Sequence, residues 1–296
     1  MRIAAVVLSR GQEAFAPCIA RAISSQTVKP DMVLAVMDRP SPSEREATER
    51  AYAGIPGVEF LSVECAPGTV RRPPMREGQE PFCAGHCRNL ALELLDGRYE
   101  LAVFIDGDCA PSRGWIESFR LAYGEGRVIV GRRRETKWLG MDQRQCSQEH
   151  PVDIFGPVPR EVTEEWKFVD SGVMWTCNVG FTPGAVRGIR KINSDLYGVS
   201  TVFHPDFTGR WGGEDGFLGM ECFYGGVPVW TAPATGMDGV YHMEHPRPSD
   251  TYGHRGFIRF MEEKRRELVL LLGAAGKWKG GLRSAASILE GRDGKE

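Results

Sequence analysis

Short apolar runs that alternate with helical patterns constrain the fold of this chain more than any other feature of its sequence. Five runs are rich in valine and isoleucine, as is typical of parallel strands covered on both faces. They span residues 3–8, 32–37, 58–63, 100–105 and 127–131. Helical patterns lie between them, over residues 15–26, 42–54, 85–97 and 111–124. The alternation predicts an α/β fold with an open, mostly parallel sheet flanked by helices, in which ligands bind beyond the carboxyl ends of the strands.

The composition narrows the class of protein. With 42% hydrophobic and 26% charged residues, the chain has the composition of a soluble globular protein. A net charge of −2 gives no overall attraction to nucleic acid or to an anionic membrane. The first residues predict a strand rather than a signal peptide, and no stretch approaches the ~20 apolar residues that span a bilayer. We therefore expect a cytoplasmic protein whose cysteines are reduced and act as small apolar side chains.

The second half of the chain is less regular. Residues 65–84 and 134–172 are rich in polar residues, proline or glycine, and long loops of this kind often form lids or substrate walls. Residues 253–290 have apolar side chains at helical spacing and predict one or two helices. No linker separates the halves, so we expect one domain with an elaborated C-terminal part.

The sequence "VFIDGDCAPS" places Asp106 and Asp108 where an apolar run ends. Residues two apart in an extended chain point to the same side, so both carboxylates could address one ion. Gly107 removes the side chain between them and lets a ligand approach. Carboxylate oxygens suit Mg²⁺ or Mn²⁺, although a polar turn at a strand end would give the same pattern.

Two further segments carry groups that suit catalysis. His242 and His245 lie close together, and imidazole ligands favour Mn²⁺ over Mg²⁺. Glu214 and Asp215 follow two glycines at the start of a helical pattern. A helix N-terminus favours the ionised form of a carboxyl group, and an ionised carboxylate can act as a general base for a hydroxyl group. An ordinary acidic first turn of a helix would give the same pattern. Trp211 nearby offers a flat apolar surface of the kind on which sugars stack.

Taken in order along residues 3 to about 248, these segments resemble the GT-A glycosyltransferases near the broad family 2 group. Two segments resemble the donor half of those enzymes. The first is the opening strand, helix and second strand that end at Asp38, and the other is "GHCRNLALELLDGRYELAVFIDGD". The segment "WGGEDGFLGMECFYGG" resembles the acceptor-side motif of the β-1,4-galactosyltransferase and polypeptide N-acetylgalactosaminyltransferase groups. The segment "HMEHPRP" resembles their later metal-ligand segment.

The resemblance implies a role for each matching residue of the donor side. Asp38 matches the position near the nucleoside base, and Ser9 belongs to the same nucleotide-sugar site. Arg88 matches a position close to the diphosphate, and Asp106 the aspartate that faces the sugar or ribose. The implied metal ligands are Asp108, His245 and, as a companion, His242.

On the acceptor side, the resemblance implies that Asp215 is the catalytic base of an inverting enzyme and that Glu214 contacts the acceptor. Trp211 and Gly213 are the further acceptor-binding residues. The implied GT-A domain covers residues 1–250, with a nucleotide-sugar-binding half over 1–131 and an acceptor half over 132–250. Residues 251–296 form a C-terminal helical extension.

The implied function is a Mn²⁺- or Mg²⁺-dependent transfer of a sugar from a nucleoside-diphosphate sugar to a hydroxyl group, with inversion. A UDP-sugar is favoured, although Arg39 and Pro40 replace the residues that commonly follow Asp38 in relatives and leave the nucleotide open. The acceptor could be a saccharide, a protein or a hydroxylated nucleobase. The absence of the Golgi anchor of many relatives favours a bacterial or viral enzyme. A sugar-phosphate nucleotidyltransferase and a non-catalytic sugar- or nucleotide-binding module are the alternatives.

Overall fold

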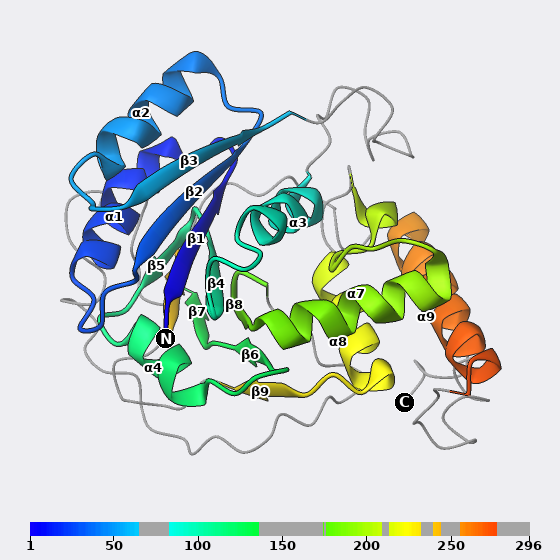
Figure 1. Ribbon diagram of the computed structural model, residues 1–296. Coiled ribbons are helices and arrows are strands. Elements are labelled where there is room, and N and C mark those ends of the chain that lie inside the picture. Colours follow the sequence, from blue (N-terminus) through cyan, green and yellow to red (C-terminus); the bar gives the residue numbers. More distant parts are fainter. Residues whose placement is uncertain are drawn as a thin grey trace.

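The computed structural model describes residues 1–64, 83–135, 174, 176–208, 213–231, 239–243 and 255–276. They form an α/β structure around a seven-stranded sheet with the order β3-β2-β1-β4-β8-β6-β9 (Figure 1). Its strands are β1 (Ile3–Ser9), β2 (Met32–Asp38), β3 (Val58–Val63), β4 (Leu101–Asp106), β6 (Val128–Val130), β8 (Asn178–Phe181) and β9 (Val229–Thr231). Strands β1 to β4 are parallel, as are β6 and β9, whereas β8 is antiparallel to both neighbours. The predicted mostly parallel sheet is confirmed.

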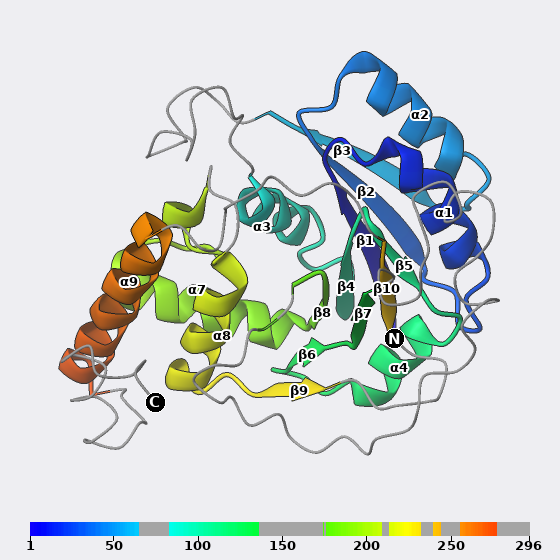
Figure 2. The same cartoon turned by 180° about the vertical axis from the view of Figure 1, so that it is seen from behind.

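Helices cover both faces of this sheet (Figures 1 and 2). The helices are α1 (Ala16–Ser24), α2 (Pro42–Tyr52), α3 (Ala84–Leu94), α4 (Trp115–Ala122), α7 (Pro183–Tyr197), α8 (Glu214–Gly225) and α9 (Arg255–Ala274), with short 3₁₀ turns η1 (Glu13–Phe15) and η3 (Pro205–Phe207). Alternate side chains of β1 pack into two different cores, one with α1 and α4 and the other with α3 and α7. The continuous apolar runs therefore reflect strands that are buried on both faces.

The start of α4 differs from the prediction. The sequence pattern places a helix over residues 111–124, but Pro111 is the last residue of strand β5 (Cys109–Pro111), and the helix begins at Trp115. Pro111 pairs with Val240 in the register of a second sheet, so its backbone is extended. Tertiary pairing thus overrides the usual preference of proline for the first turn of a helix.

The second sheet has three strands and places groups beside the end of β4. Its order is β5-β10-β7, with β7 at Arg133–Glu135 and β10 at Val240–His242. In the antiparallel pair of β5 and β10, His242 lies opposite Cys109. The backbone N–H of Met243 donates to the carbonyl of Asp108 at 2.8 Å. The small sheet therefore brings the segment around residue 242 to the Asp-Gly-Asp turn.

The C-terminal part ends in α9, which confirms a helix within residues 253–290; residues 277–296 lie outside the described residues. Helix α9 packs its apolar side chains on α8 and η3. Lys264 of α9 also forms ion pairs with Asp206 and Glu267. None of the described helices combines the length and the apolar character that crossing a membrane requires.

The cysteines only partly follow the expectation. Within the described part of the chain, five cysteines are free and buried, as small apolar side chains would be: Cys18, Cys87, Cys109, Cys177 and Cys222. Cys83 instead takes part in a disulfide bond, so the expectation that all cysteines are reduced is wrong at that residue. Sequence spacing alone does not reveal such a pairing, because it depends on how close two segments come in the fold.

Candidate active site

The candidate site lies at the carboxyl ends of β1, β2 and β4 and at the N-terminus of α8. Asp38 is the last residue of β2, and Asp106 is the last residue of β4. Glu214 and Asp215 are the first two residues of α8, which confirms the predicted helix start; the preceding Gly213 has a φ of 91°. Because parallel strands end at one edge of the sheet, residues far apart in the sequence meet there.

Asp108 is held by groups from three segments. Gln12 Nε2 donates to its Oδ2 at 2.8 Å, and His242 Nε2 lies 3.3 Å from the same oxygen. The thiol of Cys109 donates to Oδ1 at 3.3 Å. The side chains of Asp108 and His242 are only 7% and 8% exposed. A carboxylate and an imidazole are thus brought together at the strand end, as the proposed metal ligands require.

Asp106 has a different set of partners. Arg88 Nη2 donates to Asp106 Oδ1 at 2.7 Å, and Arg88 Nη1 lies 3.4 Å from Glu214 Oε1. Arg88 is only 3% exposed and lies over the ring of Phe203, 5.6 Å from its centroid. The expectation that Asp106 and Asp108 act as one extended pair is therefore too simple. Because β4 ends at Asp106, the chain turns before Asp108, and the two carboxylates contact different partners.

The pKa shifts of the acidic groups are opposite to the sequence-based expectation. Burial, reinforced by the nearby charge of Asp215, raises the pKa of Glu214 to about 8. Burial also raises the pKa values of Asp215 and Asp106, although Arg88 lowers each of them in part. The helix N-terminus does favour the ionised forms through backbone N–H groups, but desolvation outweighs it. For Asp215, the backbone N–H of Thr176 adds a further lowering contribution.

Asp38 is enclosed by donors. Arg39 Nε donates to Oδ1 at 3.0 Å, the backbone N–H of Cys83 donates to Oδ2 at 3.1 Å, and Arg10 Nη1 lies 3.6 Å from Oδ2. Arg39 has a φ of 47°, which is uncommon for a residue other than glycine and often marks a functional site. Ser9 and Asp38 both line a cavity of about 10 Å³ at the ends of β1 and β2. The predicted nucleotide-binding residues Ser9 and Asp38 are thus brought together.

Two predicted site residues, Trp211 and His245, lie outside the described residues. Within the described ranges, no group of three or more His, Cys, Asp or Glu side chains forms a complete metal site. Asp108 and His242 nevertheless supply an oxygen and a nitrogen ligand of the kind that Mn²⁺ accepts. The residues present therefore fit part of a divalent-cation site.

Sequence reasoning missed Gln12 and Cys109 as partners of Asp108. Gln12 is 96 residues away from Asp108 along the chain, so no local pattern connects them. The one available signal is that Gln12 lies just after the first predicted strand, at the edge of the sheet where ligands bind.

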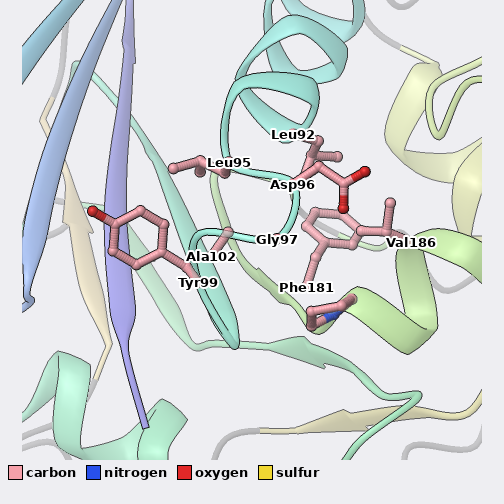
Figure 3. A pocket seen from close by; sticks show the side chains of 9 residues that line it. Leu92, Leu95, Asp96, Gly97, Tyr99, Ala102, Phe181 and Val186 are labelled. Carbon is pink, nitrogen blue, oxygen red and sulfur yellow. The ribbon is translucent and has the colours of Figure 1, made fainter.

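A second cavity, shown in Figure 3, lies away from these groups. It measures about 30 Å³ and is lined mainly by apolar side chains, including Leu92, Tyr99, Phe181 and Val186. Among the described residues that line it, Asp96 is the one that carries a charge. A space of this size holds no more than a few water molecules, and it contains none of the predicted site residues.

Comparison with known proteins supports the fold. No family model matches the sequence, and no curated protein matches it. The chain is similar to the S. aureus TarS fragment 1–349 in complex with UDP-GlcNAc, with a TM-score of 0.61 and 13% identity over 98% of this chain and 70% of that chain. The same fragment in complex with UDP gives a TM-score of 0.59, 13% identity, and the same coverage. Against a longer TarS structure the TM-score is 0.59 at 13% identity, over 98% of this chain and 42% of that one. This likeness concerns the fold, so the chain has the mostly parallel, Rossmann-like GT-A fold that the sequence predicts.

Proposed function

We propose that this protein is a divalent-cation-dependent glycosyltransferase that moves a sugar from a nucleoside-diphosphate sugar to a hydroxyl acceptor, with inversion at the anomeric carbon. One observation carries the proposal. The Asp108 and His242 pair lies at the end of β4, and Arg88 connects the neighbouring Asp106 to Glu214 at the start of α8. Ligands for a leaving diphosphate and carboxylates for an acceptor are thus held at one edge of the sheet.

The donor side consists of the ends of β1, β2 and β4. Ser9 and Asp38 are proposed to lie at the nucleoside, because both line the small cavity at this edge. The fold is shared with TarS structures that hold UDP-GlcNAc or UDP, which supports a UDP-sugar as the favoured donor. Asp106 is proposed to face the sugar or ribose. Arg88 Nη2 donates to Asp106 Oδ1 at 2.7 Å, so we propose that Arg88 orients this carboxylate in addition to lying close to the diphosphate.

Asp108 and His242 would hold a Mn²⁺ or Mg²⁺ ion, together with His245 as the sequence resemblance implies. When bound, the ion neutralises charge that develops on the leaving nucleoside diphosphate. The buried carboxylate of Asp108 is suited to this role because His242 Nε2 lies only 3.3 Å from its Oδ2, so an oxygen and a nitrogen ligand are already close together.

On the acceptor side, Asp215 is proposed as the general base. It is partly exposed at the start of α8, and burial raises its pKa toward the range in which a carboxylate removes a proton more effectively. Asp215 takes the proton of the acceptor hydroxyl, whose oxygen forms a bond to the anomeric carbon. The bond from that carbon to the diphosphate oxygen breaks, and its electron pair leaves with the nucleoside diphosphate.

Glu214 is proposed to position the acceptor hydroxyl. Its Oε1 lies near Arg88, whereas its Oε2 is buried and has no hydrogen-bond partner within the described part of the chain. A buried oxygen without a partner is costly, so a bound hydroxyl group would satisfy it. Gly213 and Trp211 are proposed to complete the acceptor side. The domain limits and a cytoplasmic location stay predictions.

A turnover assay with Mn²⁺ and a panel of nucleoside-diphosphate sugars tests the proposal. Donor hydrolysis with water as the acceptor makes the assay possible before the natural acceptor is identified. We expect release of the nucleoside diphosphate that stops in EDTA, and a fresh sugar whose anomeric configuration, followed by NMR, is opposite to that of the donor. Retention of the anomeric configuration would contradict direct displacement. Release of pyrophosphate from a nucleoside triphosphate would indicate a nucleotidyltransferase. Binding of a donor without turnover of any donor would indicate a binding module.

A further inference from the structure

Gln12 lies between the two halves of the donor site. Gly11, with a φ of 61°, turns the chain just after β1, and the backbone N–H of Phe15 donates to the carbonyl of Gln12 at 2.9 Å. The backbone of Gln12 is therefore fixed at the start of η1. Its side chain lines the small cavity beside Ser9 and also reaches Asp108.

The turn at Gly107 makes room for this side chain. The N–H of Gly107 donates to the carbonyl of Leu8 at 2.6 Å, so the turn lies directly against the end of β1. A Cβ atom added at Gly107 would lie 2.8 Å from Gln12 Oε1 and 2.8 Å from Ser9 Cβ, closer than such contacts allow. The glycine between the two aspartates therefore permits the approach of Gln12 as well as that of a ligand.

The contact joins a neutral donor to a buried carboxylate. Gln12 Nε2 donates to Asp108 Oδ2 at 2.8 Å, and Cys109 donates to Oδ1. An amide fixes the orientation of a carboxylate without contributing a positive charge that would repel a cation. Asp106 shows the contrasting arrangement, because its partner Arg88 is a cation. Partners that orient metal ligands commonly affect metal affinity by about 10–100-fold.

We propose that Gln12 is a positioning residue that fixes the Asp108 carboxylate for the divalent cation. The proposal rests on the proposed function, because it takes Asp108 as a cation ligand. It goes beyond that function by assigning to the loop after β1 a role in cation binding as well as in nucleoside binding. Gln12 acts through Asp108 and need not touch the cation itself.

Mn²⁺ titration of the intact protein, followed by the EPR signal of free Mn²⁺ with and without saturating UDP, tests the proposal. The variant Gln12→Met keeps the length of the side chain and removes the donor. Gln12→Leu provides a second apolar replacement if the first does not fold, and thermal unfolding by circular dichroism reports folding. Arg10→Met is the matched control, because it changes the same loop at a side chain that pairs with Asp38.

We expect Gln12→Met to weaken Mn²⁺ binding by about 10-fold at an unchanged melting temperature, and Arg10→Met to leave the Mn²⁺ dissociation constant within about twofold. Raising Mn²⁺ should restore the turnover of Gln12→Met, since the site is misoriented rather than absent. Equal Mn²⁺ affinity in wild type and both Gln12 variants would overturn the proposal while leaving the glycosyltransferase assignment intact. Failure of the wild type to bind Mn²⁺ with UDP present would overturn both the metal assignment and the role of Gln12.

Discussion

The candidate site has two regions that use acidic residues in opposite ways. The Asp108 side comprises Gln12, Asp108, Cys109 and His242, and the Arg88 side comprises Arg88, Asp106, Glu214 and Asp215. On the Asp108 side, an amide and a thiol donate to the carboxylate and bring no positive charge of their own. On the Arg88 side, a buried guanidinium meets two carboxylates, and burial raises the pKa values of all three acids.

This difference indicates a division of labour. A carboxylate oriented by neutral donors suits a cation. A buried guanidinium between carboxylates instead holds these groups in a rigid frame, and it partly offsets the rise in their pKa values that burial causes. Replacing a side chain on the Asp108 side should therefore affect mainly the chemistry. Replacing one on the Arg88 side should affect both the chemistry and the stability, because an uncompensated buried charge is costly.

The largest expected effect is that of Asp108→Ala. Removing the proposed cation ligand should lower Mn²⁺-dependent transfer by at least about 10³-fold, since a metal ion contributes several kcal/mol of charge stabilisation. The melting temperature should change little, because Asp108 lies in a turn rather than in the apolar core. Donor turnover and thermal unfolding measure the two effects. Full activity of the variant, or undiminished wild-type activity in EDTA, would show that the Asp108 side holds no catalytic cation.

Asp215→Asn should have the next largest effect. The amide keeps the shape of the side chain and removes its basicity, so kcat should fall by about 10²–10⁴-fold. Mn²⁺ and nucleotide binding should survive, because Asp215 belongs to the Arg88 side. Steady-state kinetics with a saturating donor, alongside Mn²⁺ titration, provides the measurement. A kcat near that of the wild type would show that Asp215 is not the general base but an ordinary acidic residue in the first turn of a helix.

Arg88→Met tests the difference between the two sides through the stability of the protein. The change leaves Asp106 and Glu214 without their guanidinium partner, which should lower the free energy of unfolding by about 3–5 kcal/mol in urea denaturation. Arg45→Met is the matched control, because Arg45 pairs with Glu49 on an exposed surface of α2 where its side chain is 55% exposed. Loss of such a pair should cost less than about 1 kcal/mol. Equal effects of the two changes would contradict the buried frame.

Glu214→Gln should have the smallest effect on turnover, and its effect on stability should depend on pH. The pKa of Glu214 is about 8 in the folded protein against a reference value of 4.5, so the folded state holds its proton more tightly than the unfolded state. This stabilisation is complete below about pH 4.5 and is lost as the pH rises through about 8. The melting temperature of Glu214→Gln should therefore rise relative to the wild type across that window.

The acceptor KM of Glu214→Gln should also increase with little change in kcat, as expected for a positioning group. If the difference in melting temperature between Glu214→Gln and the wild type were the same at every pH, folding would not raise the pKa of Glu214, and the account of its burial would be wrong.

Much of the fold could be predicted from the sequence, because β1, β2 and β4 are continuous apolar runs that only burial on both faces explains. The start of α8 was also predictable from the two glycines before Glu214. The start of α4 was not, since the pairing of Pro111 with Val240 depends on a segment more than 100 residues away.

The sequence predicts the residues of the candidate site but not the contacts that they make. The carboxylates and His242 follow from strand ends and family resemblance, whereas the separation of Asp106 from Asp108 results from where β4 ends. Likewise, the helix N-terminus predicted ionised acids, and only the burial of Glu214 shows why its pKa rises instead. Desolvation depends on packing from several elements, which no local sequence pattern reports.

Mn²⁺ titration of the intact protein with UDP present, comparing wild type, Asp108→Asn and Asp106→Asn, tests the central claim most directly. Both variants remove one carboxylate charge from the same turn, so they match in size and charge. We expect Asp108→Asn to weaken Mn²⁺ binding by about 100-fold or more and Asp106→Asn by less than about 10-fold, because Arg88 is the partner of Asp106. Equal losses, or a greater loss in Asp106→Asn, would contradict the assignment of the cation to the Asp108 side.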